Sequence, residues 1–206
     1  MKIGVISGSH REKSQSEKVA RFVAHQLSER ELCDEVYIYA LGGNPLPFWD
    51  EGLWSGEQRW EDALGELRRE VASCDAFVIV TPEWHGMAPA GLKNFFLMFP
   101  GSGELAHKPA LLIAVTTGAT GGSYPVAELR MSSYKNSRIC YLPEHLIVRH
   151  ADKVFNADAQ DNQLEQHDYL HKRLGYCLEL LREYALAFTN IRASGRASLA
   201  EYNNGM

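Results

Sequence analysis

The amino-acid sequence predicts an α/β protein, with a five-stranded parallel sheet covered by helices on both faces and an added C-terminal helix. Two observations carry this prediction. Short apolar runs alternate along the chain with segments of helical periodicity, which is the pattern of repeated strand–helix–strand units. The chain has 206 residues, of which 45% are hydrophobic, and this size suits one well-packed core. We therefore expect a single domain.

The predicted strands are short apolar runs. They span Lys2 to Ile6, Glu35 to Ala40, Ala76 to Thr81, Ala110 to Thr117, and Leu142 to Val148. Runs of this kind are typical of parallel strands that are buried between two helical layers. Parallel neighbours need a crossover connection, so a helix is expected between each strand and the next.

The predicted helices have apolar residues three and four positions apart. The stripes of the first two helices are Val19, Phe22, Val23 and Leu27, and then Trp60, Leu64, Leu67 and Val71. A third helix is expected to start near Ala90, and a fourth to run from about Val126 to Tyr134.

A long helix is predicted after the last strand, from about Leu164 to Thr189. Its apolar stripe comprises Leu170, Leu174, Cys177, Leu178, Leu181, Ala185 and Phe188. We expect this helix to cover the sheet. Residues 1–190 would then form the domain, and residues 191–206 a polar and loosely ordered tail.

The charge balance argues against nucleic-acid and membrane partners. The chain has 21 basic and 26 acidic residues, a net charge of -5, and no long basic run. No apolar run approaches the length of a membrane span, and Met1 and Lys2 lead straight into a strand without a signal-type segment. We therefore expect a soluble cytoplasmic protein.

Neither the cysteines nor the histidines form a recognisable metal motif. The four cysteines are widely spaced without a CxxC pair, so we predict ordinary thiols. His167 and His171 stand four residues apart, as two ligands on one helix face would, but no glutamate base or third ligand accompanies them. A solvated helix face explains them better.

The candidate site lies in the loops after the first, third and fourth strands, because ligands of parallel sheets bind at the carboxyl ends of the strands. The first loop is SGSHREKSQS, residues 7–16. Its hydroxyls, the Arg11 guanidinium and the N–H groups at the following helix start suit a phosphate. Since it has neither GxGxxG nor GxxxxGK[ST], a monophosphate is favoured. The alternative is a helix cap, with Ser14 or Ser16 bonding free N–H groups and Arg11 in solvent.

The other two loops suit a flat ligand. The second loop, TPEWHGMAPAGLKNFF (residues 81–96), has prolines and glycines that make a stiff turn, and Trp84 could pack beside a planar heterocycle or belong to the core. The third loop, TTGATGGSYP (residues 116–125), holds three glycines that let its backbone approach a ring closely.

Taken in order, the three loops resemble the motifs of one family. The pattern GSxRxxSxN is matched at Gly8, Ser9, Arg11 and Ser14, with Ser16 where asparagine is usual. The pattern PEYNxSxPGxLKN is matched at Pro82, Glu83, Pro89, Gly91, Leu92, Lys93 and Asn94, while Trp84 and His85 replace tyrosine and asparagine. Over roughly residues 1–148 the chain resembles the NADPH-dependent FMN reductase family, the flavodoxin-like group that includes flavin, quinone, azo-dye and chromate reductases.

This resemblance implies a flavodoxin-like three-layer sandwich with strand order 2-1-3-4-5. It implies bound FMN, with NADPH or NADH as co-substrate and a small electron acceptor such as a quinone, a flavin, an azo dye or a metal oxyanion, reduced by a ping-pong route. The residues that would bind the cofactor are Ser9, Arg11, Ser14, Gln15, Ser16, Pro82, Glu83, Trp84, His85, Gly86, Thr117, Gly118, Gly121 and Gly122. Hydride transfer needs no general base, so no catalytic side chain is predicted. The resemblance also implies a homodimer or homotetramer.

Two other functions fit the same fold. A flavodoxin-type electron carrier would bind FMN without reacting with a nicotinamide, but such carriers use a threonine-rich phosphate loop where this chain has Arg11. A sensor that binds another phosphorylated ligand is the third reading.

Two segments fall outside the motifs. Residues 42–60 bring Phe48, Trp49, Trp54 and Trp60 into a long connection, which we expect to pack against something. With the tail, this segment is the candidate contact surface between subunits. Arg192 and Arg196 are candidates to reach a neighbouring subunit or a nicotinamide phosphate.

Overall fold

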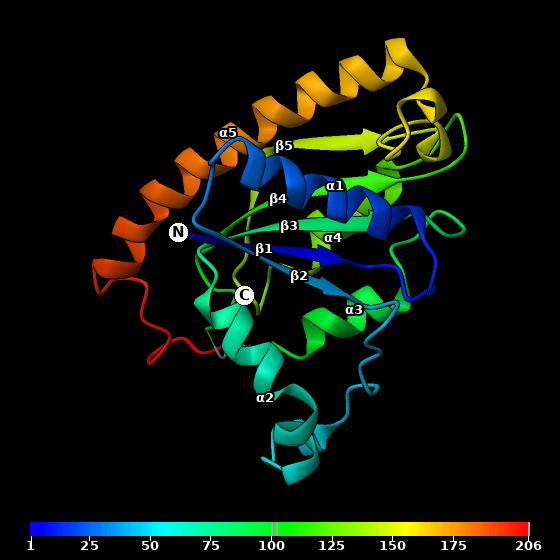
Figure 1. Ribbon diagram of the computed structural model, residues 1–206. Helices are drawn as coiled ribbons and strands as arrows, with labels where there is room; N and C mark the ends of the chain where they lie inside the picture. The colour runs from blue at the N-terminus through cyan, green and yellow to red at the C-terminus, as the bar shows by residue number, and fades with distance from the viewer. Residues whose placement is uncertain (100, 102, 206) are drawn as a thin grey trace.

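The computed structural model describes residues 1–99, 101 and 103–205, and in them a five-stranded parallel sheet lies between two layers of helices (Figure 1). The strands are β1 (Lys2–Ser7), β2 (Glu35–Ala40), β3 (Ala76–Pro82), β4 (Pro109–Val115) and β5 (Cys140–Val148). Their order is β2-β1-β3-β4-β5, with every neighbouring pair parallel. The predicted fold class and strand order are confirmed.

Five α-helices are present in the described residues, as the periodicity predicts. They are α1 (Gln15–Glu29), α2 (Gln58–Ser73), α3 (Ala90–Leu97), α4 (Ser123–Ser132) and α5 (Leu164–Ala193). Short 3-10 turns lie at Glu51–Leu53, Ala151–Lys153 and Ala159–Asp161.

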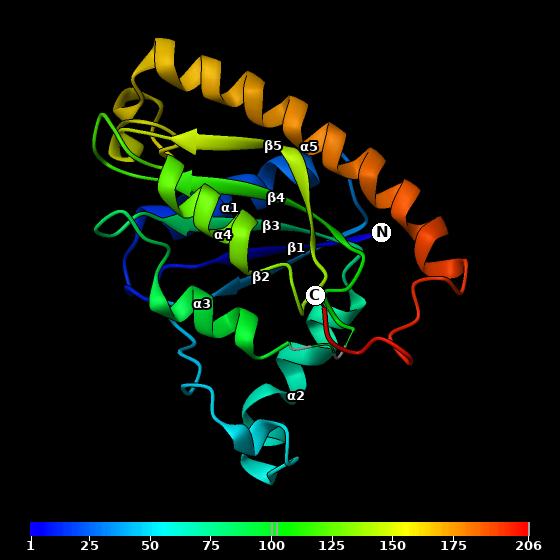
Figure 2. The same cartoon turned by 180° about the vertical axis from the view of Figure 1, so that it is seen from behind.

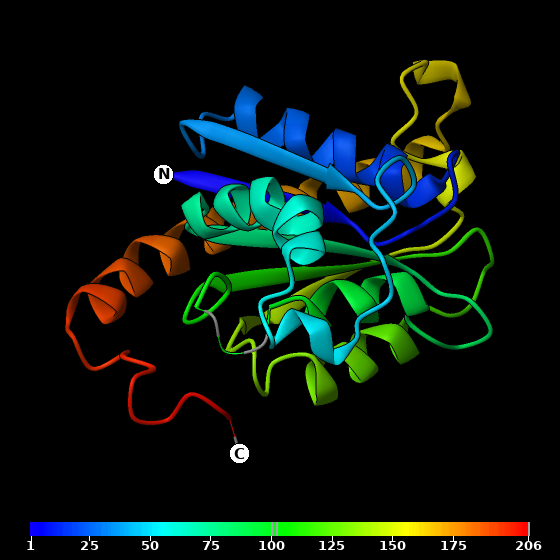
Figure 3. The ribbon, with the colours of Figure 1, turned by 90° about the horizontal axis from the view of Figure 1, so that it is seen from below.

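The sheet separates two hydrophobic cores, because successive side chains of a strand point to opposite faces. In β1, Ile3 and Val5 pack with α1 and α5, whereas Ile6 packs with α2 and α3. Figure 3 shows α1 and α4 on opposite sides of the sheet, and Figure 2 shows the face that α2, α3 and α4 cover. Since both faces are covered, the central strands β1, β3 and β4 are almost wholly buried, whereas β2 and β5 at the two sides of the sheet are partly exposed. Ligands can therefore reach the sheet at its edges.

Two element ends near the candidate site differ from the prediction by two residues or more. β4 ends at Val115, two residues before the expected Thr117, because the chain turns into the third loop at Thr116. α4 begins at Ser123, ahead of the expected Val126, since Pro125 is tolerated in the first turn of a helix. The connection between β4 and α4 therefore spans residues 116–122.

The C-terminal helix α5 covers one face of the sheet, as predicted. Six members of the expected stripe are buried, and Phe188 is half-buried. The helix continues past the expected Thr189 to Ala193, so it includes the first residues of the predicted tail. The rest of the tail turns back along the chain, where Arg138 donates hydrogen bonds to the carbonyls of Tyr202 and Asn203.

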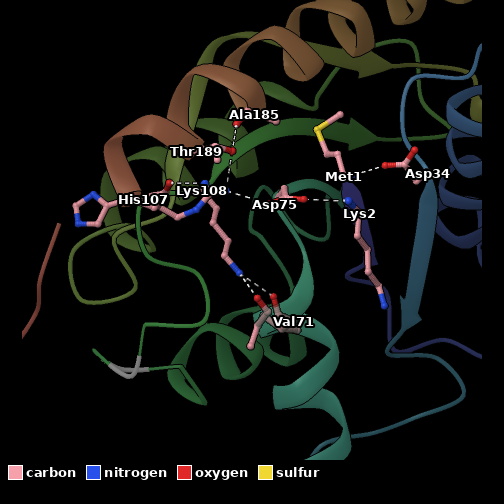
Figure 4. A network of polar contacts seen from close by, with 11 residues as sticks. Met1, Lys2, Asp34, Val71, Asp75, His107, Lys108, Ala185 and Thr189 are labelled. Atoms are coloured by element: carbon pink, nitrogen blue, oxygen red, sulfur yellow. Dashed lines mark hydrogen bonds and ion pairs between the residues drawn. The ribbon is translucent and has the colours of Figure 1, made fainter. Parts of the chain in front are cut away.

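A polar network ties several elements together at the amino ends of the strands (Figure 4). Asp75, just before β3, accepts from the Lys2 backbone N–H at 3.0 Å and from Arg192 Nη2 at 3.0 Å. The buried Lys108 donates to the carbonyls of Val71 and Ala72 at the end of α2, at 3.1 and 2.7 Å. Arg192 is therefore bound at the edge opposite the candidate site, and a role toward a nicotinamide phosphate in the same chain is not supported.

The histidine pair on α5 packs against aromatic side chains, so the predicted solvated face is wrong. His167 and His171 are half-buried beside Phe22, with ring centroids 6.2 and 5.7 Å away. His167 Nδ1 accepts from the Phe155 N–H at 3.2 Å, and His171 Nε2 lies 2.6 Å from Gln26 Oε1. Both rings thus join α5 to α1. Burial of the His171 ring lowers its pKa.

The aromatic segment 42–60 packs partly on its own chain. Trp60, in the first turn of α2, is buried in the core. Trp49 lies against the same core, and its ring meets that of Trp54 edge-on with centroids 4.8 Å apart. Phe48 and Trp54 remain 80% and 68% exposed.

None of the helices in the described residues combines the length and apolarity that a membrane span requires.

Candidate functional site

The three predicted loops meet at the carboxyl edge of the sheet, toward which the strand arrowheads point in Figure 1. Together they line a cavity of about 150 Å³. Nine of the predicted residues line it: Ser9, Arg11, Ser14, Gln15, Ser16, Pro82, Glu83, Trp84 and Thr117. Val115 and Thr116 line it as well and were not predicted. Segments that are far apart in the sequence therefore build one site.

The first loop forms a cradle at the start of α1. Ser14 is the N-cap of this helix, and its Oγ accepts from the Glu17 N–H at 3.1 Å. Ser9 is 1% exposed, and its Oγ accepts from the Arg11 N–H at 3.3 Å. Ser16 is 2% exposed, while Arg11 lies in solvent at the rim. The capping role of Ser14 is confirmed. The same loop lines a cavity at the positive end of the helix dipole, and phosphate binding there stays a prediction.

Gln15, which lines the cavity, has a side-chain oxygen without a hydrogen-bond partner in the described part of the chain. Oε1 of Gln15 is buried, and it has no hydrogen-bond partner among the described residues. A buried acceptor without a donor costs free energy, on the order of 1–3 kcal/mol, so a hydroxyl donated by a ligand would relieve it.

The second loop is a tight two-residue hairpin. Trp84 and Met87 exchange backbone hydrogen bonds of 3.1 and 3.0 Å, and between them His85 and Gly86 have φ of 50° and 75°. Positive φ at both central positions defines a type I′ turn, which favours asparagine followed by glycine. His85 is exposed, and neither it nor Gly86 lines the cavity. The turn therefore explains why histidine, which tolerates positive φ better than most side chains, stands where asparagine is usual.

Trp84 closes one side of the cavity. It is half-buried, and its ring meets that of His10 edge-on, with centroids 4.6 Å apart and an interplanar angle of 84°. Trp84 therefore belongs to the site and not to the core. His10 comes from the first loop, so this aromatic pair joins the first and second loops.

The third loop is shaped by its glycines. Gly121 and Gly122 have φ of 97° and 87°, and a Cβ on Gly122 would lie 2.4 Å from Ile147 Cγ2. Gly118, Gly121 and Gly122 do not line the cavity, whereas Thr116 and Thr117 do. These two glycines are thus required by the backbone and by packing on β5, and binding of a ligand by the three glycines stays a prediction.

Two carboxylates bind backbone N–H groups of the second and third loops. Glu83 accepts from the Gly122 N–H, and Glu128 of α4 accepts from the Ala88 N–H at 2.7 Å and from Lys93 Nζ at 2.9 Å. Burial raises the pKa of Glu128, but these two donors lower it by more, so that its pKa lies below the ordinary value. Glu128 does not line the cavity, but it holds the second loop, and the sequence did not reveal this contact.

The sheet order and the position of the cavity define the chain as a flavodoxin-like α/β protein. Among solved structures, the NAD(P)H:(acceptor) oxidoreductase FerB from Paracoccus denitrificans superposes with a TM-score of 0.69, covering 91% of this chain and 98% of FerB at 20% identity. The model of the NADPH-dependent FMN reductase family matches residues 1–153, and the chain belongs to this family.

Three characterised relatives are similar in sequence. An NADPH azoreductase from Bacillus sp. is 35% identical over 59% of this chain and 62% of its own length. A quinone reductase from Pseudomonas putida is 31% identical over 58% of this chain and 62% of its own length. A 2-hydroxy-1,4-benzoquinone reductase from Burkholderia sp. is 25% identical over 82% of this chain and 90% of its own length. The chain thus spans less than two thirds of the first two relatives.

Proposed function

We propose that this protein is an FMN-dependent NAD(P)H oxidoreductase that reduces a small acceptor, such as a quinone or an azo compound. The observation that carries the proposal is that three family motifs, separated in sequence, line one cavity at the carboxyl edge of the sheet. The names of the azoreductase and quinone reductase relatives support the choice of acceptor class.

The residues of the cavity fit FMN. Buried hydroxyls of Ser9 and Ser16, the N-terminus of α1 and the Arg11 guanidinium at the rim offer donors and positive potential to a phosphate. The unpartnered Oε1 of Gln15 can accept from a hydroxyl of the sugar-like chain. At about 150 Å³, the cavity is smaller than the ~300–1,000 Å³ of typical ligand pockets, so it encloses the phosphate end and leaves the ring on a more open surface.

When bound, FMN supplies the hydride and electron chemistry. The chain contributes binding and orientation: Trp84 offers an aromatic wall, and Thr116 and Thr117 face the same cavity from the third loop. No side chain is assigned a proton-transfer role, since hydride transfer requires none.

We also propose that the protein is a homodimer or homotetramer. Large apolar side chains are exposed on the second loop, on α3, on α4 and just after α4: Met87, Leu97, Tyr124, Met131 and Tyr134. Leu97 also lines a hollow of about 290 Å³ between α3 and the end of α4. Light scattering coupled to size exclusion tests this, and a monomer at micromolar concentration contradicts it. Four free cysteines accord with a cytoplasmic location, which we also propose.

The visible absorption spectrum of the purified protein tests the proposed activity, recorded with FMN before and after NADPH is added without oxygen. Flavin bands that bleach and then recover on addition of a quinone support the oxidoreductase. Flavin bands that persist with both NADPH and NADH would instead indicate an electron carrier. A protein that takes up no FMN overturns the proposal and leaves a binding protein for another phosphorylated ligand.

A further inference from the structure

The second loop and the start of α4 are joined by two hydrogen bonds to carboxylates, one from each segment. Glu83, in the second loop, accepts from the N–H of Gly122, the residue that caps the start of α4. Glu128, in α4, accepts from the N–H of Ala88 in the second loop at 2.7 Å. Each segment therefore supplies one carboxylate acceptor and one backbone N–H donor. This reciprocal pair resists separation of the two segments, because loss of either hydrogen bond leaves a charged acceptor and an amide donor unpaired.

Glu83 closes the third loop at both of its ends. Its own N–H donates to the Val115 carbonyl at 3.2 Å, at the end of β4, and its side chain holds Gly122. Thr116 and Thr117, which line the cavity, lie between these two anchors. A Cβ on Gly121 would come within 3.0 Å of Glu83 Oε1, so the glycine lets the loop approach the carboxylate this closely.

Glu128 holds the second loop against α4. Ala88 is 1% exposed, so its N–H has no access to water and would be an unpaired donor without the carboxylate. The second oxygen of Glu128 accepts from Lys93 Nζ at 2.9 Å, which connects the pair to α3. Arg149 Nε donates to the Gly121 carbonyl at 3.1 Å and supports the third loop from β5.

From these contacts we infer that Glu83 and Glu128 are positioning residues, forming a two-carboxylate clasp that sets the gap between the second and third loops. The inference rests on the proposed function, in which the flavin ring lies against these loops. The clasp also occupies the N–H groups of Gly122 and Ala88, so these two amides are not donors to the ring. Glu83 then acts through the third loop, and it need not contact the cofactor.

Alanine and glutamine variants at both positions separate the contact from the charge. Glu83→Gln and Glu128→Gln keep an acceptor oxygen, whereas Glu83→Ala and Glu128→Ala remove it. Glu70→Ala is the matched control, because it removes a carboxylate that pairs with Lys2 Nζ at 2.6 Å at the opposite edge of the sheet. The measurements are amide hydrogen exchange of the FMN-free chain and the dissociation constant of FMN.

The clasp predicts coupled loosening. Glu83→Ala should speed exchange in residues 116–122 about tenfold or more and weaken FMN binding by a similar factor, as expected for loss of a hydrogen bond to a charged group. Glu128→Ala should speed exchange in residues 84–89 and also in residues 116–122. The double alanine variant should be little worse than the stronger single variant, because the two contacts act as one unit. Both glutamine variants should stay within about threefold of the wild type, as should Glu70→Ala.

Several outcomes would overturn the inference. They are unchanged exchange in residues 116–122 with Glu83→Ala, additive effects in the double variant, or a glutamine variant as impaired as its alanine counterpart. If Glu83→Ala does not fold, the exchange pattern of Glu128→Ala decides the same question. A wild-type chain that takes up no FMN overturns the proposed function, and the exchange data then decide the clasp by themselves.

Discussion

Gly42 touches the predicted phosphate cradle from outside, and its replacement by alanine tests how firmly that cradle is held. Gly42 follows the end of β2, and a Cβ built on it would lie 2.4 Å from the Arg11 carbonyl oxygen and 3.4 Å from that of Ser9. Ordinary van der Waals contact begins at 3.4 Å, so the new methyl group is about 1 Å too close to Arg11. The obstacle is backbone and cannot swing aside. Gly42→Ala must therefore displace the first loop, the segment after β2, or both.

The expected effect is on binding more than on folding. Sites of this kind tolerate misplacement of about 0.5 Å, and a shift near 1 Å costs up to ~100-fold in function. We expect Gly42→Ala to weaken FMN binding about tenfold or more. Gly43→Ala is the matched control, since a Cβ there meets nothing within 4 Å. Titration of each FMN-free variant by quenching of flavin fluorescence gives the dissociation constants. Equal FMN affinities of the two variants would refute the reasoning.

Three further predictions concern a helix cap, the core and a buried amine. Ser14→Ala should lower the free energy of unfolding by about 1 kcal/mol in urea titrations through loss of the α1 cap, while Ser14→Asp should keep the cap but weaken FMN binding by repelling the phosphate. Leu174→Ala, at a fully buried position of α5, should cost about 2–5 kcal/mol, against less than about 0.5 kcal/mol for Leu186→Ala at an exposed position of the same helix. Burial lowers the pKa of Lys108 to about 8. Between about pH 8 and 10.5 the unfolded chain therefore binds more protons than the folded chain, so the free energy of unfolding should rise with pH. The rise relative to Lys108→Met should be at most about 3 kcal/mol.

Each of these has a result that contradicts it. Equal unfolding free energies of Ser14→Ala and wild type would remove the capping role, and unchanged FMN binding by Ser14→Asp would place the phosphate elsewhere. A Leu174→Ala variant as stable as Leu186→Ala would mean that α5 does not cover the core. A stability difference between wild type and Lys108→Met that stays flat from pH 8 to 10.5 would show that the amine keeps its ordinary pKa.

The strands and the first loop are predictable because their signals are local. An apolar run bounded by polar residues identifies a buried strand, and a parallel sheet then directs attention to the carboxyl end of each strand. Ser14 follows the rule for helix caps, and the structure places it there. The family motifs added the strand order, which periodicity does not specify.

The missed residues depend on short turns and distant contacts. Val115 was assigned to the interior of a strand that was expected to reach Thr117. Thr116 belongs to the predicted third loop but was not among the predicted cofactor-binding residues. The turn at His85 and Gly86 lacks the usual Asn-Gly signal, although its geometry is the same. Glu128 meets Ala88 across 40 positions of sequence, and no spacing rule relates two such residues.

The placement of the two chain ends has a practical consequence. Met1 pairs through its ammonium with Asp34, and the segment around Tyr202 and Asn203 is held by Arg138, just before β5. The N-terminus and the segment around Tyr202 and Asn203 thus lie near the amino ends of the strands (Figure 1). The cavity is lined by the loops at the other end of the sheet. A tag, a fusion partner or a surface linker attached at either terminus would leave the mouth of the cavity facing solution. The protein can therefore be immobilised on an electrode or a sensor chip through either end with the edge that carries the cavity accessible.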